Sequence, residues 1–563
     1  MRTRSFLIIL VSAAGLAAGA WAAGPEFEVG TAPGQQTRGA RLGAPEMRLS
    51  LQDAITTALA HNINLEVSRL SLASAQQGLL GSTGIFDPVV KSDLGASYYE
   101  EQSTNQLVGA NVAVQRGRQF DLSLGALVAT GGSYSVAWTN TRSKTNSSFY
   151  FLNPAYSSGL TLSLAQPLLK GFGTDVTRAG IEVARRSRDI SRVQFQEIVI
   201  NTAQAVENAY WNLVYAIDNL KAKQHSHMLA QDLLEQTRAR VRIGTAAPID
   251  VVQPEAAVAA REVDIIVAEN AVGNAGDALK GLLGFENPQD WTSTIIPTDA
   301  LEGVAEHPDL DASIAEAIEK RPELRQRQLE LEIGQVNLVA ARSAARPQLD
   351  LSLNYGYSGV GGDSTIYDPQ TGQVISYIPG GWSNALRQLR DRDYNQWSAM
   401  INFSYPLGNH QAKALVAQDR FAVASARQNI ALQRQAVIED VRNAVRGLDA
   451  SGKAITAAVK SRELAERNLD AEQKKLAAGI STNFQVVKIQ DDLATAQAAE
   501  LQSRVLYRQA MATYKVAVGT FLEALGISIK SGPEPKEPHT AFKNVRWLKF
   551  APNPEAGGVP SAR

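Results

Sequence analysis

Residues 199–220 have the sequence VINTAQAVENAYWNLVYAIDNL, and the spacing of the apolar residues in this stretch decides the fold class. Apolar side chains recur at alternating steps of four and three positions, at Val199, Ala203, Val206, Tyr210, Leu213, Ile217 and Leu220. This alternation is the seam of a coiled coil, in which one stripe of each helix packs against a neighbour. Because no proline occurs from about residue 175 to 242, the whole segment is predicted to form one long helix.

A second segment, about 411–478, has the same character. Its apolar residues recur first at steps of seven, then eleven, then seven, at Val416, Val423, Ile430, Val437, Leu448 and Ile455. The eleven-residue step relaxes a left-handed supercoil. At about 1.5 Å per residue, each helix would be on the order of 100 Å long. Each is predicted to turn at a glycine, Gly244 or Gly479, into a return helix that ends near Gly284 or Gly526.

The two helical hairpins belong to an internal duplication. A shift of 259 positions matches seven identical residues in one ungapped register: Leu51, Ile55, Ala58, Leu65, Leu70, Leu72 and Pro88 match Leu310, Ile314, Ala317, Leu324, Leu329, Leu331 and Pro347. The shift falls to 239 at Pro167 and to 235 at the hairpin glycines. The first copy therefore contains an insertion between Pro88 and Pro167.

Each copy also contains predicted strands, because apolar and small polar residues alternate with a period of two. The apolar positions are Val90, Leu94, Ala96, Tyr98, Leu160, Leu162, Leu164, Leu349, Leu351, Leu353, Ala399, Ile401 and Phe403. This pattern fits a barrel in lipid or a half-buried soluble sheet. Aromatic residues at strand ends, such as Tyr355 and Trp397, favour the barrel. The insertion repeats the pattern at about 120–138, either as a further spanning hairpin or as one that only decorates an outer loop.

The N-terminus indicates export. Arg2 and Arg4 precede an apolar run from Phe6 to Ala20, and a cleavage site is expected near Ala22 or Ala23, which together predict a signal peptide. No other stretch is apolar enough for a spanning helix, which argues against a helical inner-membrane protein. The 55 basic and 56 acidic residues give a net charge of −1, which excludes a nucleic-acid binder with a basic surface. Cysteine is absent, which excludes disulfides and an N-terminal lipid on cysteine.

The order of these elements resembles the TolC-like outer-membrane efflux protein family over about residues 49–526. The local resemblance lies in Leu51–Ile55, Lys320–Leu324, Gln166–Leu169, Val241–Val252 and Leu476–Gly479. The resemblance implies a mixed fold of helices and transmembrane strands. In that fold a homotrimer shares one β-barrel in the outer membrane, which continues as a long α-helical coiled-coil barrel across the periplasm.

The resemblance divides the chain into repeats. The expected segments are a signal peptide (1–23), an N-terminal extension (24–48), a first repeat (49–286), a linker or equatorial region (287–308), a second repeat (309–526) and a flexible C-terminal tail (527–563). Membrane strands are expected at about 88–167 and 347–406, and helical hairpins at about 174–284 and 410–526, with tips near 244 and 479.

The resemblance also implies the function: an outer-membrane channel-tunnel of a tripartite efflux or type I secretion system. Its implied partners are a periplasmic adaptor (membrane fusion) protein, an inner-membrane transporter and outer-membrane lipid, with no nucleic acid. The alternatives are a periplasmic coiled-coil adaptor and a non-transport outer-membrane barrel protein. No enzymatic activity, metal or cofactor is expected.

In the family, the hairpin tips form the periplasmic entrance and dock the adaptor. The docking residues that this resemblance implies are Val241, Gly244, Thr245, Leu476 and Gly479. The entrance residues are Asp250, Gln485 and Lys488, where Gln485 and Lys488 replace acids and argue against a strongly cation-binding ring. Asp250 also suits a helix cap near Pro248.

Other motifs have weaker interpretations. Residues 447–454 approximate a phosphate-binding loop but have Ala454 where a hydroxyl is needed, inside a predicted helix. His225 and His227 are two positions apart and therefore lie on different helix faces. Residues 359–362 are interpreted as a loop rich in glycine between strands.

Overall fold

The computed structural model describes residues 29–31, 46–103, 111–147, 150–301, 307–367 and 373–529. The predicted signal peptide and the chain after residue 529 lie outside these residues. The described chain divides into a helical unit, which contains the described residues up to Ala75, those of 188–329 and those from Arg427 onward, and a sheet unit, which contains those of 76–187 and 330–426. The helices α2 (Ile63–Thr83), α4 (Ala179–Arg242), α7 (Pro322–Ala344) and α9 (His410–Ala477) contribute residues to both.

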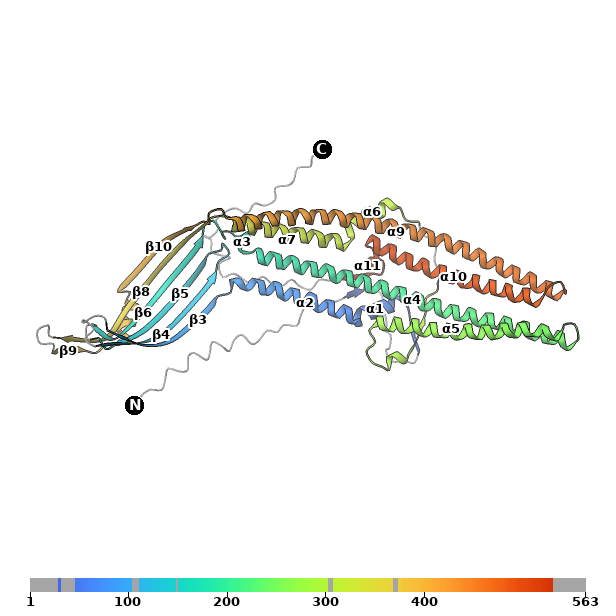
Figure 1. Cartoon of the computed structure of the whole chain (residues 1–563), viewed down its shortest axis with the longest axis horizontal. Coiled ribbons are helices and arrows are strands. Elements are labelled where there is room, and N and C mark those ends of the chain that lie inside the picture. The colour runs from blue at the N-terminus through green and yellow to red at the C-terminus, as the bar shows by residue number, and fades with distance from the viewer. Residues whose placement is uncertain are drawn as a thin grey trace, which may run out of the picture. The chain divides into compact units, whose positions relative to one another are not determined.

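The sheet unit is built on one antiparallel sheet, whose strands lie side by side in Figure 1. The strands are β3 (Val89–Gln102), β4 (Val112–Leu127), β5 (Ser133–Thr145), β6 (Leu152–Pro167), β8 (Gln348–Tyr367), β9 (Val374–Ile378) and β10 (Tyr394–Ser404). Their order is β10-β8-β6-β5-β4-β3, and β9 pairs with β8 outside this path. Strands from both predicted repeats therefore lie in a single sheet, which has β3 and β10 at its edges.

The inserted hairpin, β4 and β5, lies inside this sheet. Leu122 of β4 is paired with Trp138 of β5, and Trp138 is paired with Leu160 of β6. The pairing of β4 with β3 and of β5 with β6 excludes the alternative in which this hairpin only decorates a loop.

The register gives the sheet two different faces. The apolar face contains Leu94, Phe120, Leu122, Leu124, Val136, Trp138, Leu160, Leu162, Leu164, Leu351, Leu353, Tyr355, Trp397, Ile401 and Phe403. The polar face contains Lys91, Asp93, Gln119, Asp121, Ser123, Thr139, Thr161, Ser163, Asp350, Ser352, Asn354, Ser398 and Asn402. On the apolar face of the single chain, Leu94 is 80% exposed and Trp397 is 75% exposed. A contiguous exposed apolar surface of this kind marks contact with lipid or protein.

A short helix, α8 (Trp382–Asp391), packs against the apolar face of the sheet. It contacts β8 at residues 359–362. A Cβ atom on Gly359 would lie 2.1 Å from the Ala385 carbonyl oxygen, so only glycine permits this approach. The interpretation of residues 359–362 as a loop is therefore wrong: they lie within β8, and their glycines make room for the helix.

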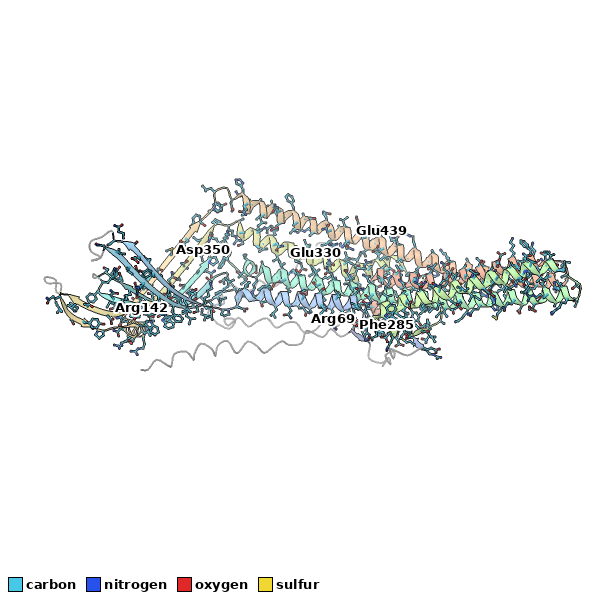
Figure 2. The ribbon with its side chains drawn as sticks, turned by 60° about the horizontal axis from the view of Figure 1, so that its bottom comes forward. Arg69, Arg142, Phe285, Glu330, Asp350 and Glu439 are labelled. Atoms are coloured by element: carbon cyan, nitrogen blue, oxygen red, sulfur yellow. The ribbon has the colours of Figure 1, made fainter. Side chains whose placement is uncertain are left out.

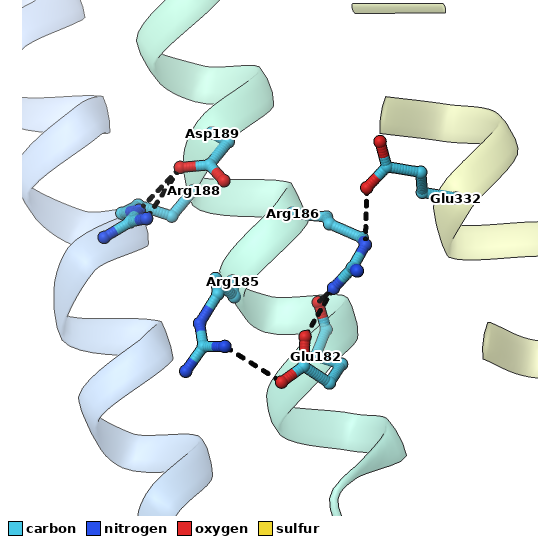
Figure 3. A network of polar contacts seen from close by, with 6 residues as sticks. All are labelled: Glu182, Arg185, Arg186, Arg188, Asp189 and Glu332. Carbon is cyan, nitrogen blue, oxygen red and sulfur yellow. Dashed lines mark hydrogen bonds and ion pairs between the residues drawn. The ribbon is translucent and has the colours of Figure 1, made fainter. Parts of the chain in front are cut away.

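Helix segments of the sheet unit are joined by a polar network (Figure 3). Arg186 of α4 donates to Glu332 of α7 at 3.0 Å and also pairs with Glu182 at 2.5 Å. Arg185 pairs with the other oxygen of Glu182 at 2.9 Å. The remaining short elements of this unit are η1 (Gly84–Phe86) and α3 (Thr174–Thr177).

The helical unit contains two long hairpins, α4 with α5 (Val252–Leu283) and α9 with α10 (Asn483–Val518), which Figure 1 shows as paired rods. The shorter elements are α1 (Leu51–His61), α6 (Leu310–Lys320), α11 (Phe521–Ala524), η3 (Pro248–Val251), η4 (Asp290–Thr292), β1 (Val29–Thr31), β2 (Glu46–Leu49), β7 (Thr294–Pro297) and β11 (Ile527–Ile529). Strand β2 pairs with β7 in parallel, and β1 pairs with β11 in antiparallel orientation.

The seam of α4 is the centre of the main core. Val199, Ala203, Val206 and Tyr210 are 0% exposed, and they cluster with residues from α1, α5, α10 and α11. The Tyr210 hydroxyl donates to Asp299 at 2.6 Å, and Asp299 also accepts the Leu51 amide at 2.8 Å. Burial and the bond to Asp299 raise the pKa of Tyr210 well above its ordinary value. The phenol thus joins α4 to the start of α1 and to the segment that follows β7.

Two predicted boundaries are wrong. The return helix α10 ends at Val518 rather than near Gly526, because Gly519 adopts a left-handed φ of 87° and closes it. The tail predicted to begin at 527 instead starts with strand β11, where Ile527 is buried in the main core. Among the described residues, no helix is both long enough and apolar enough to cross a membrane.

Candidate entrance at the hairpin tips

The first tip (residues 241–252) begins with a glycine turn that ends α4. Gly244 has a φ of 78° and donates its amide to the Val241 carbonyl at 3.1 Å. Thr245 donates its amide to the Arg240 carbonyl at 2.9 Å. These two bonds form a Schellman motif, which satisfies helix-end carbonyls and needs the left-handed conformation that glycine adopts freely.

The second tip (residues 476–487) ends α9 with the same turn. Gly479 has a φ of 77° and donates to the Leu476 carbonyl at 3.2 Å, while Ile480 donates to the Lys475 carbonyl at 3.0 Å. Space is open around both glycines, since a Cβ atom would meet nothing within 4 Å. The two tips therefore share one turn, 235 positions apart, as the sequence match predicts.

The tips differ in how the return helix is capped. In the first tip, the Asp250 carboxylate accepts the backbone amide of Ala247 at 3.0 Å. In the second tip, the Thr482 hydroxyl accepts the amide of Gln485 at 3.4 Å. These contacts are the two reciprocal halves of a capping box, one half at each tip. Asp250 is therefore not the N-cap that the sequence suggested: it lies at N3, and its carboxylate bonds back to the N-cap residue Ala247.

Contacts between α4, α5, α9 and α10 hold the two hairpins together behind the tips. Asn483 donates its side-chain amide to the Asp250 carbonyl at 3.3 Å, and buried Gln490 donates to the Leu229 carbonyl at 3.3 Å. Arg261 of α5 forms an ion pair with Asp491 of α10. An apolar cluster of Leu233, Leu469, Leu476, Val486 and Leu493 lies between the helices.

The predicted site residues fall into two groups. Gly244, Thr245, Gly479, Asp250, Gln485 and Lys488 are exposed. Leu476 is 7% exposed and packs within the apolar cluster, and Val241 is half-buried. The side chain of Leu476 therefore packs beneath the turn, in the apolar cluster, and is not part of the surface of the second tip.

Two acidic residues that the sequence analysis missed stabilise the second hairpin. Glu472 accepts from the Ser481 hydroxyl and pairs with Lys475 at 3.1 Å, and these two contacts lower the pKa of Glu472. Burial disfavours the charge of Glu500, but its contacts with Arg504 and Arg462 outweigh burial and lower the pKa of Glu500. The Ser481-Thr482 pair, two residues after the helix-ending Gly479, is the signal that could have found the first of these contacts.

The weaker motifs occupy ordinary helical positions. Residues 447–454 lie within α9, without the loop that phosphate binding requires. His227 lies 3.7 Å from Glu262 on the neighbouring helix. In the described part of the chain, no three or more histidine, aspartate or glutamate side chains gather as metal ligands would.

Comparison with known proteins decides the family. The model of the family described as "Outer membrane efflux protein" matches residues 127–285 and 313–520, more than half of the chain. The chain belongs to the outer membrane efflux protein family. The family is one of transport proteins rather than enzymes, and its members are outer-membrane proteins, as this chain is.

Relatives agree with this assignment, and solved structures share the fold. The chain is 24% identical to Outer membrane protein TolC of Escherichia coli over 372 residues, 64% of this chain and 71% of that protein. It is 24% identical to Pyoverdine export outer membrane protein OpmQ of Pseudomonas putida over 341 residues, 59% of this chain and 66% of that protein. The crystal structure of the CmeC outer membrane channel of Campylobacter jejuni has a similar fold, with a TM-score of 0.60, 14% identity, and coverage of 84% of this chain and 86% of that one.

Proposed function

We propose that this protein is the outer-membrane channel-tunnel of a tripartite efflux or type I secretion system. It would conduct cargo passively from an inner-membrane transporter and a periplasmic adaptor protein to the outside. The observation that supports this most is the amphipathic sheet with two unpaired long edges, in a member of an outer membrane efflux family. Open sheet edges are not tolerated in lipid, so strands β3 and β10 require partners.

Three copies would supply those partners. If β3 of one copy pairs with β10 of the next, each copy contributes the six strands of the main path, and three times six gives an eighteen-stranded barrel. Barrels of roughly this strand number enclose a water-filled channel. The polar face would line that channel, and the apolar face would contact lipid.

The helical hairpins would continue the channel through the periplasm, with their tips at the entrance. Exposed Asp250, Gln485 and Lys488 would then surround the opening, three copies of each. The adaptor would dock beside Val241, Gly244, Thr245 and Gly479. Because Asp250 also caps the first tip, its charge and its structural role have to be separated experimentally.

Conductance measured in planar bilayers, with and without divalent cations, distinguishes the effect of the Asp250 charge from the effect of its hydrogen bond to Ala247. Asp250→Asn keeps an oxygen that accepts the Ala247 amide but removes the charge, whereas Asp250→Ala removes both. We expect single-channel conductance from wild type and weaker divalent-cation block in both variants. Gln485→Ala, at the matching position of the second tip, is the control and should leave the block unchanged. Unchanged block in Asp250→Asn would remove this residue from the entrance.

Assembly is tested separately. Outer-membrane extracts should contain a detergent-stable trimer, and cysteines introduced on β3 and β10 should cross-link neighbouring copies. A soluble periplasmic monomer would overturn the proposed channel and would support the adaptor alternative.

A further inference from the structure

The apolar face of the sheet carries a group of basic residues at one end. Arg116 is paired directly with Lys144, and Arg118 is paired directly with Arg142, on the neighbouring strands β4 and β5. Even numbers of residues separate these positions from Phe120 on β4 and from Trp138 on β5, so the basic side chains share the apolar face. They lie toward the strand ends farthest from those that join helices, and Figure 2 shows Arg142 there, away from Asp350.

The pairing of basic residues on β4 and β5 destabilises the sheet when no anion is bound between them. Like charges directly opposite each other on neighbouring strands repel. Among the residues that the structure describes, none of these four basic side chains has an ion-pair partner. Arg116, Arg118 and Lys144 are exposed, and Arg142 is half-buried. An anion between the two strands would remove the repulsion.

Tyrosine rings hold two of these arginines on the apolar face. The Arg116 guanidinium lies 5.5 Å from the centre of the Tyr98 ring, and that of Arg142 lies 5.7 Å from the Tyr156 ring. Arg142 also donates to the Tyr156 hydroxyl at 3.1 Å. Rings of this kind are typical of the boundary between lipid tails and headgroups. The guanidinium groups are thus fixed at the depth where headgroups lie.

Helix α8 extends the same surface. Trp382 donates its ring N–H to Asn140 at 3.1 Å and packs against Trp138 with ring centres 6.0 Å apart. At the other end of the helix, the Arg392 guanidinium lies 6.0 Å from the Tyr357 ring. Both contacts are with residues of the apolar face, so α8 lies on that face of the sheet.

The helix has the character of an interfacial helix. Ala385 is buried against β8, while Arg387 and Arg390 are exposed on the opposite side. A short helix with apolar residues on one side and arginine on the other lies at a membrane surface and attracts anionic lipid. The basic side chains of β4, β5 and α8, together with the residue that caps the C-terminus of α8, form what we call the basic rim: Arg116, Arg118, Arg142, Lys144, Arg387, Arg390 and Arg392.

We propose that the basic rim binds the phosphate groups of an anionic glycolipid of the lipid A type in the outer leaflet. This inference rests on the proposed function for the placement of the apolar face in lipid. Phosphates would lie between the paired basic residues of β4 and β5, and acyl chains would pack on Leu122 and Leu160 below them. The apolar surface directly beneath the charges favours a lipid over a soluble phosphate compound.

The test titrates lipid A into the full chain, purified in uncharged detergent, and follows binding by native mass spectrometry. Arg118→Gln/Lys144→Gln removes one charge from each opposing pair and should weaken binding about thirtyfold, at about 1 kcal/mol per charge. Arg387→Gln/Arg390→Gln on α8 should weaken it by a similar factor. The control, Lys91→Gln/Arg420→Gln, removes two exposed charges from the polar face and from α9, and should bind lipid A as wild type does.

Further arms distinguish a lipid site from binding of phosphate alone and from a loss of folding. Dephosphorylated lipid A, phosphatidylcholine and inorganic phosphate should each bind far more weakly than lipid A. Without lipid, Arg118→Gln/Lys144→Gln should unfold at the same or a higher temperature than wild type, because the mutual repulsion is gone. Equal weakening by the control pair, binding of inorganic phosphate alone, or a lower unfolding temperature without lipid would overturn the proposal. Conductance of the wild-type protein in planar bilayers tests the channel independently. If the wild-type protein conducts ions but binds no lipid A, the proposed lipid site is wrong and the proposed channel stands.

Discussion

The two hairpin tips have the same turn but different caps. Gly244 and Gly479 close α4 and α9 with the same pair of backbone bonds and almost the same φ. The first tip is then capped by the Asp250 carboxylate, and the second by the Thr482 hydroxyl. The two tips thus share the backbone geometry, which glycine dictates, and differ in the side chains around it. One consequence is that a negative charge stands at the first tip only, at the position where the second has Gln485.

The largest difference between the tips should lie under the turn. Leu476 is buried in the apolar cluster, whereas Val241 at the matching position is half-buried. Leu476→Ala should destabilise the second tip by about 2–5 kcal/mol, because it removes buried methyl groups and leaves a cavity. Val241→Ala should cost the first tip clearly less. Hydrogen exchange of peptides from each tip measures both, and equal losses would contradict the difference in burial.

The two glycine turns, in contrast, should lose equal stability when their glycine is replaced by alanine. Gly244→Ala and Gly479→Ala should each destabilise their own tip by about 1–2 kcal/mol, because a side chain disfavours the left-handed conformation. Open space around both positions leaves no steric contribution to separate them. The same exchange measurement applies. A loss of stability at only one tip would contradict this expectation and would mean that the two turns differ in backbone strain although they share the same hydrogen bonds.

The caps should differ in chemistry rather than in strength. Asp250→Ala and Thr482→Ala should each cost about 1 kcal/mol of local stability. Ala247→Thr gives the first tip the hydroxyl that Thr482 provides in the second, so the pair Ala247→Thr/Asp250→Ala should recover most of that loss. Failure of this rescue, measured on the first-tip peptides, would show that Asp250 stabilises the tip by something other than capping.

The smallest effect is a dependence on pH in the second tip. The Ser481 hydroxyl and Lys475 lower the pKa of Glu472 below its ordinary value of 4.5. The stabilisation is therefore complete above about pH 4.5 and is lost as the pH falls through the lowered pKa. The hydrogen-exchange rate at the second tip is measured for wild type and for Glu472→Gln at each pH. The ratio of the wild-type rate to the variant rate should rise as the pH falls, because only wild type loses this contact. A constant ratio between the two proteins would contradict the contact.

Periodicity predicted the parts of this fold that repeat. The seam from Val199 to Leu213 is buried as its spacing requires, and the helices turn at Gly244 and Gly479. Helix α8 was missed because ten residues between two strands are too few for a periodic signal, and the glycines of β8 were interpreted without the helix they accommodate. The sequence match likewise placed Leu476 at a tip but did not give its burial, which depends on Leu233 from the other hairpin.

The two small sheets of the helical unit set an order for folding. Strand β2 pairs with β7, which follows the predicted first repeat, and β1 pairs with β11, which follows the predicted second repeat. A chain exported from its N-terminus would hold β1 and β2 across the membrane long before their partners arrive. The main core, which includes Phe521 and Ile527, can then close only after the chain as far as Ile527 has crossed. Pairing of early strands with late ones thus delays completion of the helical unit until nearly all of the described chain has been exported.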